Sequence, residues 1–188
     1  TLCPGESVTL TANGADDYVW SNASTAPSIA VTQAGTYTVQ GSNACGNSSA
    51  TVTVTAAPGP NVSVAGDLTF CAGGSTTLTA SGADDYVWST SATDVTIEVT
   101  TAGSYTVTGT NSCGSASSTV QVVELPQPMA VITGDTVLCG TDPVVLSASG
   151  GTSYVWSTGS TQPSITVSTP GTISVVATNA CGTSTAQV

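Results

Sequence analysis

The stretch Tyr18-Val19-Trp20 decides the fold, because it recurs as Tyr86-Val87-Trp88 and again as Tyr154-Val155-Trp156. The three tryptophans are 68 residues apart in sequence, and the cysteines that flank them keep the same spacing: Cys3, Cys71 and Cys139 before them, and Cys45, Cys113 and Cys181 after them. A fixed period over a whole chain is the signature of a tandem repeat. We therefore expect three domains: repeat 1 at residues 1–57 with its first strand missing, repeat 2 at 58–125, and repeat 3 at 126–188 with its last strand truncated.

Apolar and hydroxyl residues alternate with a period of two on both sides of the aromatic stretch. In repeat 1 this alternation predicts strands at 7–12, 18–20, 28–32, 36–40 and 49–55, with a turn at 2–6 and a hairpin turn at 43–46. No apolar period of 3.6 residues persists. The chain is therefore predicted to be all-β, and proline-rich segments at 55–60 and 124–128 are predicted to link the repeats as a semi-rigid rod.

Six cysteines in three identically spaced pairs, with no CxxC motif and no histidine, indicate disulfides formed in an oxidising compartment. Zinc is the competing interpretation, but two thiolates per repeat fall short of its usual four ligands. A 68-residue module has a small core, and closing a 43-residue loop stabilises it by roughly 4 kcal/mol. We therefore expect bridges within each repeat, namely Cys3 to Cys45, Cys71 to Cys113 and Cys139 to Cys181.

The chain of 188 residues contains 11 acidic residues and no lysine, arginine or histidine, so its formal net charge is −11. Nucleic acids and anionic membranes are held largely by lysine and arginine, so neither is an expected partner. Without histidine or lysine, the chain cannot form a Ser-His-Asp triad, a Cys-His pair or a Schiff base. No apolar run reaches the ~20 residues that span a bilayer. We expect no enzyme activity and no cofactor.

The cysteine pair, the tryptophan and the Gly-x-Tyr turn together resemble an immunoglobulin-like domain. Trp20, Trp88 and Trp156 match the tryptophan of the third strand, and Tyr37 and Tyr105 match the tyrosine corner. This resemblance implies that these five aromatic residues lie in the core. Ile173 replaces the corner tyrosine in repeat 3. Cys3 precedes its strand, so we expect the bridge at one pole of the sandwich.

A narrower pattern runs through the whole chain: Cys-x-Gly-x-Ser-x-x-Leu-x-Ala, Tyr-x-Trp-Ser, Gly-Thr-Tyr-x-Val and Asn-x-Cys-Gly. It resembles the repeats of large surface adhesins that gliding bacteria export by type IX secretion. The resemblance implies a stalk or fibre segment attached to the cell surface. The sequence starts at the phase of Thr69 and stops at the phase of Val120, so we expect a piece excised from something longer. Its partners would be neighbouring repeats, laterally associated chains, or a surface glycan or other cell-surface ligand.

Few side chains are candidates for specific chemistry. Asp16, Asp17, Asp84 and Asp85 are calcium candidates, although repeat 3 lacks the pair and no Asp-x-Asp-x-Asp-Gly loop is present. Under the bacterial resemblance, Asp135-Thr136-Val137 makes Thr136 a candidate O-glycosylation site, and Asn22, Asn47 and Asn61 begin N-linked sequons. Two alternative functions remain at this point: a calcium-stiffened adhesin module, and a carbohydrate-binding module appended to a secreted enzyme.

Overall fold

The computed structural model describes residues 1–140 and 142–188, and every regular element in this part of the chain is a β-strand. The chain divides into two compact units. Unit 1 comprises Thr1–Ala65, Thr79–Thr96 and Tyr105–Thr119, and unit 2 comprises Gly66–Leu78, Ile97–Ser104 and Val120–Val188. The predicted all-β class is confirmed.

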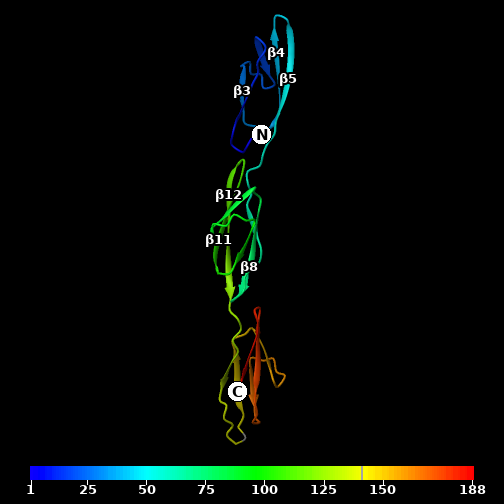
Figure 1. Cartoon of the computed structure of the whole chain (residues 1–188). Helices are drawn as coiled ribbons and strands as arrows, with labels where there is room; N and C mark the ends of the chain where they lie inside the picture. Colours follow the sequence, from blue (N-terminus) through cyan, green and yellow to red (C-terminus); the bar gives the residue numbers. More distant parts are fainter. Residues whose placement is uncertain (141) are drawn as a thin grey trace. The chain divides into compact units, whose positions relative to one another are not determined.

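Repeat 1 forms two small antiparallel sheets (Figure 1). One sheet pairs β1 (Val8–Thr11) with β3 (Ser28–Val31). The other has the order β2-β4-β5, with bounds Asp17–Trp20, Gly35–Asn43 and Gly46–Val54. The predicted strands therefore form, and β4 and β5 are longer than expected because they pair residue by residue up to Asn43 and Gly46.

Repeat 2 has the same sheets with two further strands. The first sheet has the order β10-β8-β6 and the second β7-β12-β11-β9. The bounds are β6 Ser63–Ala65, β7 Thr69–Cys71, β8 Thr76–Ser81, β9 Asp85–Trp88, β10 Thr96–Val99, β11 Gly103–Asn111 and β12 Gly114–Leu125.

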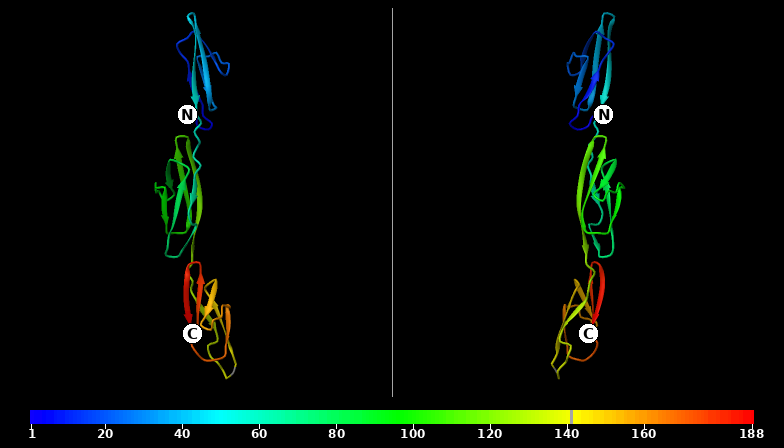
Figure 2. Two further views of the ribbon diagram at one scale, coloured as in Figure 1. Left: turned by 90° about the vertical axis from the view of Figure 1, so that its right-hand side faces the viewer. Right: turned by 60° about the vertical axis from the view of Figure 1, so that its left-hand side comes forward.

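In the described residues, repeat 3 has two three-stranded sheets, ordered β13-β14-β16 and β15-β17-β18, and the second lacks an equivalent of β7. The hairpin of β17 and β18 is visible in both views of Figure 2. The bounds are β13 Val131–Gly134, β14 Val144–Ser149, β15 Ser153–Trp156, β16 Ser164–Val167, β17 Ser174–Asn179 and β18 Gly182–Gln187.

The cores consist of the inward-facing members of the alternating strands. Trp20, Trp88 and Trp156 are 4%, 2% and 2% exposed. In repeat 1, Trp20 packs with Leu2, Ile29, Val31 and Val54, and Tyr37 lies half-buried against this cluster. Tyr105 is also half-buried. Removing a large aromatic side chain from water is the main stabilising contribution in modules of this size.

One strand was not anticipated from the sequence. Residues 2–6, expected to form only a turn, begin with Leu2 pairing in parallel with Ala56. In repeat 2 the equivalent strand β7 pairs in parallel with β12, with Cys71 opposite Leu125. The segments expected to be linkers therefore begin as paired β-structure. This pairing places the first cysteine of a repeat beside the point where the chain leaves that repeat.

Candidate functional site: the cysteines at the ends of the repeats

The second cysteine of each repeat lies at the tip of a hairpin. The backbone N–H of Cys45 donates to Oδ1 of Asn43 at 2.9 Å, and Cys113 and Cys181 repeat this bond to Asn111 and Asn179 at 2.8 Å. The glycine that follows each cysteine has a positive φ, 140°, 129° and 130° in Gly46, Gly114 and Gly182. Asparagine closes such turns with its side chain, and glycine adopts positive φ without steric cost. The Asn-x-Cys-Gly motif therefore presents the cysteine at the turn.

The first cysteine lies at the other end of the same strand. Leu2, next to Cys3, pairs with Ala56, whereas Cys45 directly precedes Gly46, the first residue of β5. The segment between Gly46 and Ala56 is extended, so at ~3.3 Å per residue the two cysteines are separated by roughly 30 Å. The Cα atoms of a disulfide are less than about 7 Å apart. A bridge within the repeat is therefore impossible in this fold.

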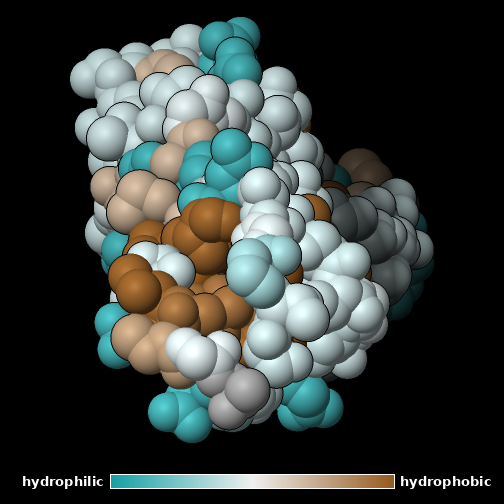
Figure 3. Space-filling view, turned by 90° about the horizontal axis from the view of Figure 1, so that it is seen from below, coloured by the Kyte–Doolittle hydropathy of each residue, from teal (hydrophilic) through white to brown (hydrophobic). Residues whose placement is uncertain are grey.

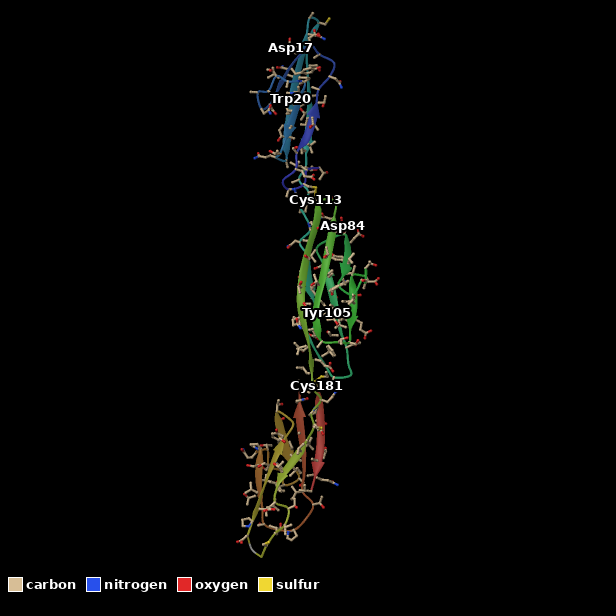
Figure 4. All side chains as sticks on the ribbon, turned by 90° about the vertical axis from the view of Figure 1, so that its left-hand side faces the viewer. Asp17, Trp20, Asp84, Tyr105, Cys113 and Cys181 are labelled. Carbon is tan, nitrogen blue, oxygen red and sulfur yellow. A yellow bond between two sulfur atoms is a disulfide. The ribbon has the colours of Figure 1, made fainter. Side chains whose placement is uncertain are left out.

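The structure instead joins cysteines of successive repeats. Cys3 is bonded to Cys113 and Cys71 to Cys181, with Cα–Cα distances of 5.2 and 5.4 Å and a sequence separation of 110 residues in both cases. Figure 4 labels Cys113 and Cys181, the members of these two bridges that lie in hairpin turns. The predicted pairs Cys3 with Cys45, Cys71 with Cys113 and Cys139 with Cys181 are therefore wrong. Equal spacing did not reveal the pairing, because a cysteine 110 residues away has the same regular spacing as one 42 residues away.

Backbone contacts explain why the two sulfurs meet. Leu2 holds the outgoing chain, since its N–H donates to the Thr55 carbonyl and its carbonyl accepts from the N–H of Ala57. The amide Nδ2 of Asn111, in the hairpin of the following repeat, donates to the Pro58 carbonyl at 3.1 Å. Cys113 Sγ lies 3.7 Å from the Ala57 carbonyl oxygen. Cys3 and Cys113 are thus both held beside the same short segment.

The second junction, within unit 2, has the same geometry. Asn179 Nδ2 donates to the Pro126 carbonyl at 3.0 Å, and Cys181 Sγ lies 3.7 Å from the Leu125 carbonyl oxygen. Gln127 Nε2 adds a bond to the Ala72 carbonyl at 3.3 Å. Both connecting segments are therefore fixed by a parallel strand pair, an asparagine side chain and a disulfide.

Two cysteines, Cys45 and Cys139, are free and exposed in the described part of the chain. One of them is the second cysteine of its repeat and the other is the first. Cys45 is the repeat-1 equivalent of Cys113 and Cys181, whereas Cys139 is the repeat-3 equivalent of Cys3 and Cys71.

The aromatic residues are tied to the backbone of their own repeats. The indole N–H of Trp20, Trp88 and Trp156 donates at 2.9 Å to the carbonyl six residues further on, in Ala26, Asp94 and Gln162. Each tyrosine of the Tyr-Val-Trp stretch both donates to and accepts from the backbone three residues earlier, as Tyr86 does with Ala83 at 2.9 Å. Tyr37 donates its hydroxyl to the Gln33 carbonyl at 2.8 Å, the bond that characterises a tyrosine corner.

The four calcium candidates are exposed. Asp16 and Asp17 lie where β2 begins, and Asp84 and Asp85 lie at the equivalent place in repeat 2; Figure 4 labels Asp17 and Asp84. Among residues 1–140 and 142–188, no three His, Cys, Asp or Glu side chains come together as a metal site. Calcium binding at these aspartates stays a prediction.

The candidate glycosylation sites are all on the surface. Asn22, Asn47 and Asn61 are exposed, and Asn22 Oδ1 accepts a hydrogen bond from the Ser24 N–H at 3.1 Å. Thr136 is exposed and lines a groove of about 360 Å³ at the end of repeat 3, together with Leu138, Leu146 and Ile173. Apolar residues gather in a hollow of the surface seen in Figure 3. Modification of these residues stays a prediction.

The fold has many counterparts among solved structures. A three-immunoglobulin structure of titin domains I67-I69, in a mutated variant, matches with a TM-score of 0.51 at 15% identity over 99% of this chain and 92% of that one. The fold is immunoglobulin-like. Sidekick-1 immunoglobulin domains 1-4 match at a TM-score of 0.47 and 14% identity, covering 100% of this chain and 71% of that one. Drosophila OTK extracellular domains 3-5 match at 0.44 and 12%, covering 100% and 91%.

Two further comparisons found no counterpart. No family model matches the chain, and no curated protein matches it. At these sequence identities the structural likeness shows the fold alone, so the function has to be argued from the site. The described residues also contain no helix that is long and apolar enough to cross a membrane.

Proposed function

We propose that this chain is a non-catalytic, tension-carrying segment of a long extracellular repeat fibre or stalk on a bacterial surface. The observation that carries the proposal is that each disulfide joins one repeat to the next. A disulfide inside a module would stabilise that module alone. A disulfide between modules adds a second covalent connection beside the peptide linker.

These bridges limit how far the chain can be stretched. The shortest covalent route from Thr1 to Val188 crosses from Cys3 to Cys113, returns along the chain to Cys71, crosses to Cys181 and continues to the end. That route has 51 Cα-to-Cα steps, in segments of two, 42 and seven, whereas the backbone alone has 187. At ~3.5 Å per step, the fully extended lengths are roughly 190 Å and 650 Å. Tension therefore cannot draw out the repeats completely.

Composition supports the extracellular and structural parts of the proposal. Disulfides persist in oxidising compartments. The net charge of −11 arises without any cation, so charge repulsion opposes edge-to-edge association of strands. Binding modules concentrate aromatic or charged anchors at one place, whereas these repeats bury their tryptophans. The resemblance to the surface repeats of gliding bacteria favours the bacterial setting.

Within this proposal, the first partners of each repeat are the neighbouring repeats of the same chain. Lateral association between chains, recognition of a surface glycan or other cell-surface ligand, and glycosylation at Thr136 are compatible with a stalk. The repeats themselves would position and space an adhesive or gliding activity.

Single-molecule stretching tests the proposal. The chain would be held by terminal ligation tags that contain no cysteine and pulled before and after reduction. We expect the full extension of the oxidised chain to be roughly 3.5-fold shorter than that of the reduced chain. The Cys45→Ser, Cys139→Ser double variant is the matched control and should stretch like the unmodified protein. Equal extension before and after reduction would contradict the tension-carrying role.

A further inference from the structure

The hairpin asparagine of repeat 2 uses both ends of its side-chain amide. Oδ1 of Asn111 accepts from the N–H of Cys113 at 2.8 Å, while Nδ2 donates to the Pro58 carbonyl at 3.1 Å. Because a backbone N–H bonds only to the amide oxygen, the turn directs Nδ2 toward the connecting segment. One side chain therefore holds the cysteine of its own repeat and the segment that leaves the preceding repeat.

These bonds form a short path between the two sulfurs of the first bridge. Cys3 follows Leu2, whose carbonyl accepts from the N–H of Ala57 at 3.0 Å. Ala57 precedes Pro58, whose carbonyl is held by Asn111, two residues before the second cysteine of the bridge. Hydrogen bonds to two adjacent residues of one segment thus bring together cysteines that are 110 residues apart in sequence.

The asparagine bonds recur 68 positions further on, in the second bridge. Asn179 accepts from the N–H of Cys181 at 2.8 Å and donates to the Pro126 carbonyl at 3.0 Å. The N–H of Ala72, which follows the first cysteine of this bridge, donates to the Leu125 carbonyl at 2.9 Å. Proline fixes its own φ and keeps the preceding residue extended, so the acceptor carbonyl is oriented in advance.

The turn itself does not require a bridge. Asn43 makes the same turn bond, to the N–H of Cys45 at 2.9 Å, and Cys45 is exposed and unbonded. Asn43 is exposed, whereas Asn111 and Asn179 are half-buried. The bond to a proline carbonyl, and not the turn bond, therefore accompanies both bridges.

We propose that Asn111 and Asn179 are positioning residues for the disulfides between repeats. Each holds the connecting segment through its amide N–H and so keeps the two sulfurs of one bridge within bonding distance. This role concerns how the bridges form, so it is independent of the tension-carrying function proposed above.

The bridges form by exchange with a low-molecular-weight disulfide such as oxidised glutathione. One cysteine thiolate attacks the external disulfide and releases a first glutathione thiolate. The second cysteine thiolate then attacks the protein sulfur of the mixed disulfide and releases the other. Two protein thiols are oxidised to one S–S bond, and the external disulfide is reduced to two thiols that take up both protons.

Positioning acts on the second step, because that step is intramolecular and depends on the effective concentration of one sulfur at the other. Losing one hydrogen bond of ordinary net strength changes such an equilibrium roughly three- to tenfold. A carboxylate in place of the amide adds to this loss, since two acceptor oxygens then face each other.

The Asn111→Asp variant separates the two bonds of the asparagine. A carboxylate oxygen still accepts from the Cys113 N–H, but neither oxygen donates to Pro58. The variant would be made in the full chain with Cys45→Ser and Cys139→Ser, so that only bridge cysteines remain.

Equilibration in glutathione redox buffers, followed by acid quenching, alkylation and tandem mass spectrometry, gives the reduction potential of each bridge separately. In Asn111→Asp, we expect the equilibrium constant for forming the Cys3–Cys113 bridge to fall about tenfold. That change raises the reduction potential of this bridge by about 30 mV. The Cys71–Cys181 bridge should be unchanged.

The second bridge separates positioning from general destabilisation. Cys71 lies in the same repeat as Asn111, so a variant that merely destabilised repeat 2 would weaken both bridges. Asn179→Asp should have the reciprocal effect and weaken the Cys71–Cys181 bridge alone. Asn43→Asp adds the same charge at the equivalent turn and should change neither bridge.

A tenfold loss confined to the bridge next to the substituted asparagine supports the proposal. No change at either bridge in Asn111→Asp and Asn179→Asp would overturn it, as would an equal loss at both bridges in Asn111→Asp.

Discussion

Cys3 is bonded to Cys113, which lies 110 residues further along the chain in the hairpin turn of the following repeat. Because Cys71 is bonded to Cys181 in the same way, residues 71–113 belong to both disulfide loops. Disulfides as well as peptide linkers therefore connect repeat 2 covalently to the repeats before and after it.

Removing the first bridge should destabilise the chain. The chain-entropy model gives about 4.7 kcal/mol for a loop of this size, so we expect Cys3→Ser with Cys113→Ser to lower the free energy of unfolding by several kcal/mol. Urea unfolding without reductant measures the change. Cys45→Ser is the control and should have little effect, because Cys45 is exposed and unbonded. Equal stability of the two variants would contradict the assignment of the bridge.

The unequal burial of two equivalent leucines predicts unequal costs for the same truncation in two repeats. Leu78→Ala removes a side chain that is 0% exposed and should cost about 3–4 kcal/mol. Leu10→Ala removes a half-buried side chain and should cost less than about half of that. Amide exchange within each repeat measures the two costs separately. A cost at Leu10 equal to that at Leu78 would contradict this difference in burial.

The tyrosine next to each core tryptophan closes a turn by hydrogen bonding. In Tyr86→Phe, the N–H and carbonyl of Ala83 lose their partner, so we expect a loss of about 1–2 kcal/mol. Val87→Thr, at a neighbouring side chain that is 53% exposed, is the control and should change stability by less than about 0.5 kcal/mol. Thermal unfolding compares the two variants.

The turn after each core tryptophan contains a residue with positive φ. This residue is Ala23 with φ 63° in repeat 1, Ser91 with φ 70° in repeat 2 and Gly159 with φ 83° in repeat 3. Because only glycine adopts this region without strain, Ser91→Gly should stabilise repeat 2 by about 0.5–1 kcal/mol. Gly159→Ala should destabilise repeat 3 by a similar amount. A loss of stability in Ser91→Gly would refute the strain argument.

The sequence predicted the strands well because their alternation is local. The aromatic strand, the β4–β5 hairpin at Asn43 and Gly46 and the burial of Trp20 all follow from residues close together in the chain. The parallel pairing of Leu2 with Ala56 was missed because it joins residues 54 apart and has no alternation of its own. That omission caused the error in disulfide pairing, since the parallel strand places Cys3 at the far end of β5 from Cys45.

The partial exposure of the repeat-1 core was foreseeable only in part. The lack of a first strand in that repeat was expected from the period, but the exposure of Leu10 and Val39 depends on how β1 and β5 face each other. The second role of the asparagine in the Asn-x-Cys-Gly motif was also missed in repeats 2 and 3. The Asn-x-Cys-Gly motif predicted a turn, and only the bonds of Asn111 to Pro58 and Asn179 to Pro126 reveal that this asparagine also holds the connecting segment.

The most direct test of the account is disulfide mapping of the unreduced chain. Free thiols would first be alkylated, and a protease that cuts at aromatic residues would be used, because the chain has no lysine or arginine for trypsin. We predict alkylated Cys45 and Cys139, one linked peptide pair containing Cys3 and Cys113, and one containing Cys71 and Cys181. A linked pair containing Cys3 and Cys45 would contradict the account.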